Sequence, residues 1–115
     1  MPPTIYHNPR CSKSRQTLQL LHEKGIEPEV IEYLKTPPDK VTLKIILEQL
    51  GLTPRQLMRT NEQAYKDYGL DDPSLSDDEL IDAMIAHPIL IERPIVLTEK
   101  GAALGRPPET VQKVL

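Results

Sequence analysis

The spacing of hydrophobic positions changes twice within the first third of the chain. Residues 4–8, TIYHN, and residues 29–34, EVIEYL, are short runs rich in strand-forming residues and bounded by turn residues. Between them, residues 12–25 place leucines on one helical face, with Lys24 in the last turn and Gly25 as a C-terminal stop. This part of the chain therefore predicts a strand, a helix and a second strand that lies parallel to the first.

The middle of the chain predicts several helices. The first begins at a cap on Asp39 or Thr42, carries leucines and isoleucines at helical spacing, and ends at Gly51. Two more begin at capping boxes, each formed by a Ser or Thr and a Gln or Glu three residues later: Thr53 with Gln56, and Ser76 with Glu79. A further short helix is predicted over EQAYKDY, residues 62–68.

The last part of the chain returns to a strand pattern. Residues 95–97 are predicted to form a strand, 98–101 a hairpin turn, 102–105 a returning strand, and 107–115 a closing helix that starts at proline. A βαβ unit followed by ββα around one mixed sheet is the plan of an α/β thioredoxin-like domain. We expect a single domain over residues 1–115, with a helical insertion at about 40–88, because the chain is too short for two independent cores.

Charge and composition narrow the range of partners. The chain is 38% hydrophobic and 27% charged, as in ordinary folded proteins, and its net charge of −3 argues against nucleic acid or an anionic membrane as the main partner. No apolar run is long enough to cross a bilayer, and residues 1–8 lack the pattern of a signal peptide. We expect a cytoplasmic monomer.

The single cysteine, Cys11, lies in a stretch with no acidic residue before Glu23. A thiol with the ordinary pKa of about 8.5 is only about 3% thiolate at pH 7, and a pKa near 6.5 requires about 2.7 kcal/mol. A helix N-terminus supplies about 0.3–1 kcal/mol, or about 2 when partly buried. We expect three nearby cations to supply the rest, namely Arg10, Lys13 and Arg15. His7 is a further candidate.

Two interpretations of Cys11 follow. It is either a buried packing residue beside a solvated charged face or a reactive thiolate, and its position between a strand and a helix favours the second. The amides of a helix start beside guanidinium groups also bind tetrahedral oxyanions. No metal-ligand spacing is present, and Ser14 stands where a CxxC motif would have its second cysteine. The resolving thiol must therefore come from outside, with glutathione and a glutaredoxin as natural suppliers.

Six segments together resemble the glutaredoxin-dependent arsenate reductases of the ArsC family, which have a thioredoxin-like fold. In chain order they are IYHNPRCSKSR, YLKTPP, LMRTN, YGL, IDAMIAHPILIERPIV and LGRPP. The resemblance implies that Cys11 is the nucleophile toward arsenate. It also implies three substrate-binding arginines, which we would otherwise interpret as solvated side chains: Arg59, Arg93 and Arg106. Glutathione is implied as co-substrate and glutaredoxin as partner, with no bound cofactor and no metal.

The same resemblance implies supporting roles for three residues. His7 would help to keep Cys11 ionised, although a histidine at the end of a strand can also simply hydrogen-bond the turn. Ser14 would hydrogen-bond the thiolate from the first helical turn. Pro94 precedes a strand where thioredoxin-like proteins hold a cis peptide beside the active sulfur, the alternative being an edge-strand proline.

Two other functions stay open at this point. One is a redox regulator that resembles the Spx branch of the same fold and binds RNA polymerase, although such regulators typically use a CxxC switch. The other is a glutathione-dependent thiol reductase with another oxidised substrate. The sequence also departs from many family members at Ser12 and Lys13, where smaller neutral residues are common, and Lys13 would either strengthen anion binding or partly obstruct it.

Overall fold

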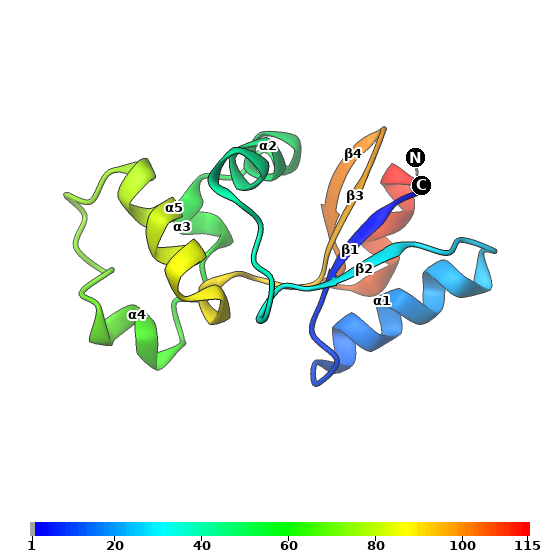
Figure 1. The fold of residues 1–115 in the computed structure, drawn as a ribbon, viewed down its shortest axis with the longest axis horizontal. Coiled ribbons are helices and arrows are strands. Elements are labelled where there is room, and N and C mark those ends of the chain that lie inside the picture. Colours follow the sequence, from blue (N-terminus) through cyan, green and yellow to red (C-terminus); the bar gives the residue numbers. More distant parts are fainter. Residues whose placement is uncertain (1) are drawn as a thin grey trace. The chain divides into compact units, whose positions relative to one another are not determined.

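The computed structural model describes residues 2–115, which divide into two compact units (Figure 1). The first unit consists of the chain up to Thr36 together with Arg93–Leu115, and the second is Pro37–Glu92. The helical insertion predicted at about 40–88 lies within the second unit. Within residues 2–115, no helix combines the length and the apolar character needed to cross a bilayer.

The first unit is built on a four-stranded mixed sheet. Its strands are β1 (Thr4–His7), β2 (Glu29–Glu32), β3 (Ile95–Thr98) and β4 (Gly101–Leu104), in the order β2-β1-β3-β4. β1 pairs with β2 in parallel, whereas β3 is antiparallel to both β1 and β4. Helix α1 (Ser12–Glu23) connects β1 to β2, and the helix η2 (Pro108–Val114) follows β4. This arrangement confirms the predicted thioredoxin-like α/β fold.

α1 and η2 pack into the same hydrophobic core of the first unit. The sheet contributes Ile5, Val96 and Ala103, which are partners across neighbouring strands. Leu21 of α1 and Val111 of η2 are fully buried against them. Because α1 is fixed to the sheet in this way, its first turn is held at the end of β1, where the chain leaves the sheet.

The closing helix differs from the prediction in type. η2 is a 3-10 helix over Pro108–Val114, whereas an α-helix was the simplest expectation. Its buried residues recur every three positions: Pro108, Val111 and Val114. A 3-10 helix has three residues per turn, so this spacing places all three side chains on the face that meets the core.

The second unit contains only helices among its regular elements. They are α2 (Lys40–Leu50), α3 (Pro54–Leu57), α4 (Gln63–Asp67), α5 (Asp77–Ala86) and the short 3-10 helix η1 (Pro88–Leu90), which was not predicted. Both predicted capping boxes are present, at Thr53 and at Ser76. Of the two predicted caps for the first helix, Asp39 is the one used, and it accepts a hydrogen bond from the Thr42 N–H at 2.8 Å.

Candidate active site

Cys11 is the N-cap residue of α1, immediately after the turn that follows β1. Its backbone is extended, with φ −93° and ψ 124°, and its N–H donates to the Asn8 carbonyl oxygen at 3.0 Å. The Asn8 side chain steadies the same turn, because its Oδ1 accepts from the Arg10 N–H at 3.0 Å. The residue is only 9% exposed. A hydrogen-bonded turn therefore places the sulfur at the N-terminus of a helix of 12 residues.

The surroundings of Cys11 lower its pKa from the ordinary value of a thiol. Burial alone acts to raise this pKa, but it is outweighed by the N–H of Ser14, the positive charge of Arg93, the N–H of Lys13 and the positive charge of Arg106. Donors and positive charges favour the thiolate over the thiol. The site therefore combines a helix start with two guanidinium groups, as a nucleophilic sulfur requires.

The cations that act most strongly on the sulfur are not the ones that the local sequence predicts. Lys13 contributes through its backbone N–H, and its side chain is exposed. Arg15 instead donates from Nη1 to the Pro9 carbonyl oxygen at 2.9 Å. The side chains of Lys13 and Arg15 are exposed, and closeness along the chain does not by itself aim their charge at the sulfur.

His7 and Ser14 form a buried pair behind the turn. Ser14 Oγ lies 2.6 Å from His7 Nδ1 and accepts a hydrogen bond from the Asn8 N–H at 3.0 Å. Burial lowers the pKa of His7 from its usual value, Glu32 acts to raise it, and Arg15 acts to lower it. His7 is therefore mainly neutral at pH 7. Its contact with Ser14 supports the turn, while the Ser14 N–H is the group that favours the thiolate.

The β3–β4 hairpin brings Arg93 and Arg106 together. The two strands pair up to Ile95 and Leu104, and beyond this pair the Gly105 N–H donates to the Pro94 carbonyl oxygen at 2.9 Å. One residue further along, Arg106 Nη1 donates to the Arg93 carbonyl oxygen at 3.3 Å. The Arg93–Pro94 bond is cis, as the resemblance implies, and so is the Arg106–Pro107 bond. Two arginines that are well separated in sequence are thus neighbours in the fold.

Gly105 is a residue of the site that the sequence did not single out. A Cβ atom at this position would lie 2.3 Å from Thr17 Oγ1 and 2.7 Å from Pro94 Cγ, both far below a normal contact. Only glycine fits between α1 and the cis-proline. Gly105 belongs to the quoted segment LGRPP, but nothing in the spacing of the sequence indicates that Thr17 lies against it.

Arg59 belongs to the second unit. Its Nη1 lies 2.6 Å from Glu62 Oε1, its Nε lies 3.7 Å from Glu92 Oε1, and its backbone N–H donates to the Leu90 carbonyl oxygen at 2.7 Å. Five predicted site residues lie with Cys11 in the first unit: His7, Ser14, Arg93, Pro94 and Arg106. Their roles in the reaction stay predictions. The role of Arg59 in binding the substrate also stays a prediction.

The fold and the site together define a thioredoxin-like domain with one thiol of lowered pKa at the N-terminus of its first helix. The model of the ArsC family matches residues 6–114. This protein belongs to the ArsC family.

Similar proteins support the assignment over nearly the whole chain. A protein named arsenate reductase from Neisseria meningitidis is 54% identical, with 96% of each chain covered. The uncharacterized protein YfgD from Escherichia coli is also 54% identical, over 96% of this chain and 94% of that protein. Among solved structures, an arsenate reductase from Vibrio cholerae has a TM-score of 0.96 and 53% identity, covering 100% of this chain and 98% of that one.

Proposed function

We propose that this protein is an arsenate reductase that reduces arsenate to arsenite through an adduct on the Cys11 thiolate. The observation that carries the proposal is the lowered pKa of Cys11 beside the helix amides and the charges of Arg93 and Arg106. It is supported by the ArsC family assignment and by relatives of similar length that are named arsenate reductase.

The proposed first step is attack of the Cys11 thiolate on arsenic(V). Arsenate is a tetrahedral oxyanion, and the planar fork of a guanidinium group matches two of its oxygens at once. Arg93 and Arg106 hold these oxygens near the sulfur, and Arg59 is the third arginine that we assign to this role. A sulfur–arsenic bond forms, and one oxygen leaves as water after it takes up a proton.

The proposed second stage uses thiols from outside the protein. Glutathione attacks the adduct, a disulfide forms between Cys11 and glutathione, and arsenic leaves as arsenite with the two electrons that the two sulfurs give up. A glutaredoxin thiol then attacks the mixed disulfide and frees Cys11. We further propose that the protein works as a cytoplasmic monomer and needs no bound metal or organic cofactor.

The direct test is arsenate turnover with glutathione and glutaredoxin. We expect activity in the wild type, none in Cys11→Ser, and a strongly raised KM for arsenate in Arg93→Ala. Lys24→Ala is the matched control, because it removes one positive charge from an exposed position of the first unit. Wild-type turnover equal to that of Cys11→Ser would contradict the proposal.

A further inference from the structure

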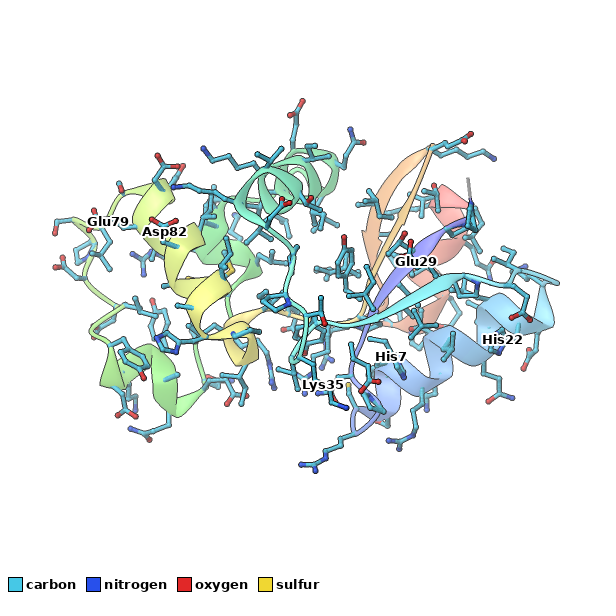
Figure 2. The ribbon with its side chains drawn as sticks, in the orientation of Figure 1. His7, His22, Glu29, Lys35, Glu79 and Asp82 are labelled. Carbon is cyan, nitrogen blue, oxygen red and sulfur yellow. The ribbon has the colours of Figure 1, made fainter. Side chains whose placement is uncertain are left out.

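A groove in the first unit runs beside the turn that leads from β1 to Cys11. It has a volume of about 330 Å³, at the lower end of the range of roughly 300–1,000 Å³ that holds small ligands in proteins. His7 contributes to its lining. The turn after β1 and the segment that includes the end of β2 also line it, with Pro9, Arg10, Glu32, Leu34 and Lys35. Figure 2 shows His7 and Lys35 near each other at this end of the unit.

The groove carries two cations and one acid. Arg10 is exposed, and within residues 2–115 no hydrogen bond or ion pair holds its side chain. Lys35 Nζ lies 3.6 Å from Glu32 Oε1, and the two side chains are 78% and 46% exposed. Such an exposed ion pair is weak, so both partners can turn to a ligand at little cost. Leu34 adds a 42% exposed apolar side chain to the same lining.

The groove also lies against residues that position Cys11. His7 lines it and contacts Ser14 Oγ at 2.6 Å, and the Ser14 N–H is one of the groups that favour the Cys11 thiolate. Asn8 lines it as well, and its carbonyl oxygen accepts the N–H of Cys11. A molecule in the groove therefore lies against the turn that fixes the position of the sulfur.

We propose that this groove binds the peptide part of a small thiol that reacts at Cys11, with glutathione as its representative. The proposal deepens the proposed function, because Ser14 occupies the place of a second cysteine and the resolving thiol must come from outside. Glutathione carries two carboxylates and one ammonium group. Arg10 and Lys35 match the carboxylates, Glu32 matches the ammonium group, and Leu34 offers apolar contact to the peptide.

The test follows a thiol exchange at Cys11 in the absence of arsenate. Cys11 is the only cysteine, so conversion of the protein to its mixed disulfide with 5-thio-2-nitrobenzoate labels one site. The thiolate of glutathione attacks the Cys11 sulfur, the disulfide to the label breaks, and the label leaves with the electron pair as a coloured thiolate. The comparison thiol is N-acetylcysteine, which has the same net charge as glutathione but has one carboxylate and no ammonium group.

We expect the glutathione rate to saturate with concentration and the N-acetylcysteine rate to stay linear. Arg10→Ala and Lys35→Ala should each lower the rate with subsaturating glutathione by roughly two- to fivefold relative to N-acetylcysteine, as for loss of one exposed ionic contact. Glu32→Gln should also lower the rate ratio of glutathione to N-acetylcysteine. A purely general charge effect instead acts on both anionic thiols alike and leaves this ratio unchanged.

Lys24→Ala is the control, and it should leave the ratio of the two rates unchanged. Equal effects of the groove variants on both thiols would overturn the proposal. So would a defect seen only with reduced glutaredoxin, which would assign the groove to a protein partner. Since no arsenate is present, selectivity for glutathione in a protein without arsenate turnover would uphold the groove and contradict only the proposed substrate.

Discussion

The guanidinium group of Arg106 donates a hydrogen bond from Nη1 to the main-chain carbonyl oxygen of Arg93, at 3.3 Å. This contact continues the β3–β4 pairing beyond the Gly105–Pro94 hydrogen bond. The charges of both arginines act on the Cys11 sulfur. The hairpin thus supplies the two positive charges that, together with the N–H groups of Ser14 and Lys13, favour the Cys11 thiolate.

The first prediction concerns the charge of Arg106. Arg106→Ala removes a positive charge that lowers the pKa of Cys11, so this pKa should rise and the fraction of thiolate at pH 7 should fall. Thiolate absorbance in the ultraviolet during a pH titration measures the change, and alkylation by iodoacetamide should slow in parallel. Arg15→Ala should have a smaller effect. A larger rise in Arg15→Ala than in Arg106→Ala would show that the local cations dominate.

The second prediction separates the two polar groups of Ser14. Ser14→Ala keeps the N–H that favours the thiolate but leaves the buried His7 and the Asn8 N–H without their hydroxyl partner. We expect a loss of about 1–3 kcal/mol in the free energy of unfolding by urea. Ser12→Ala, at an exposed position, is the control. A folded Ser14→Ala protein whose Cys11 pKa rises strongly would instead favour direct contact of the hydroxyl with the sulfur.

The third prediction is a pH dependence of stability that comes from His7. The pKa of His7 is lower in the folded state than its usual value of about 6.5. As the pH falls below about 6.5, the unfolded chain therefore binds more protons at His7 than the folded protein does. The contribution of His7 is therefore fully present above about pH 6.5 and is lost as pH falls through the folded pKa. Urea unfolding between about pH 5 and 7.5 should show a steeper rise of stability with pH in the wild type than in His7→Gln. Equal slopes in the wild type and in His7→Gln would contradict this prediction.

The fourth prediction concerns the close approach at Gly105. Gly105→Ala places a methyl group 2.3 Å from Thr17 Oγ1, and we expect this overpacking to destabilise the protein, typically by about 1–3 kcal/mol. Thr17→Ala in the same chain removes the nearest clash but leaves Pro94 Cγ at 2.7 Å, so it should restore part of the loss. Strict additivity of the two substitutions in urea unfolding would count against this contact.

The fifth prediction concerns a structural arginine in the second unit. Arg55 Nη1 donates to the Tyr65 hydroxyl at 2.6 Å and to the Leu70 carbonyl oxygen at 2.7 Å, and Nη2 donates to the Asp72 carbonyl oxygen at 2.9 Å. The Arg55 side chain therefore links α3 to α4 and to the loop after α4 through hydrogen bonds. Arg55→Ala should destabilise the second unit by about 2–3 kcal/mol.

Hydrogen exchange resolves this effect by region. Amides of α3 and α4 should lose protection in Arg55→Ala, while those of β1 and β3 should keep theirs. Lys66→Ala, an exposed position on α4, is the matched control. Unchanged protection in α3 and α4 would mean that the three hydrogen bonds contribute little.

The order of elements was predictable because its signals are local. Thr53 and Ser76 open helices through contacts within three residues, and Gly25 and Gly51 follow helix ends in the positive-φ conformation that glycine adopts readily. The convergence of Arg93 and Arg106 was not readable from spacing, because it depends on the register of a hairpin. The same limit applies to the charges that lower the Cys11 pKa, which come from Arg93 and Arg106 and not from the cations next to Cys11 in sequence. It also applies to the close approach of Gly105 to Thr17.

The β3–β4 turn, residues 99–100, lies at the opposite end of the hairpin from both arginines. An insertion there that shifted the pairing of β4 on β3 by one position would turn the side chains of β4 to the other face of the sheet. The thiol would then lose the positive charge of Arg106 from its surroundings, whereas the N–H groups of Ser14 and Lys13 would stay in place. The reactivity of Cys11 therefore depends in part on the length of a loop at the far end of the hairpin.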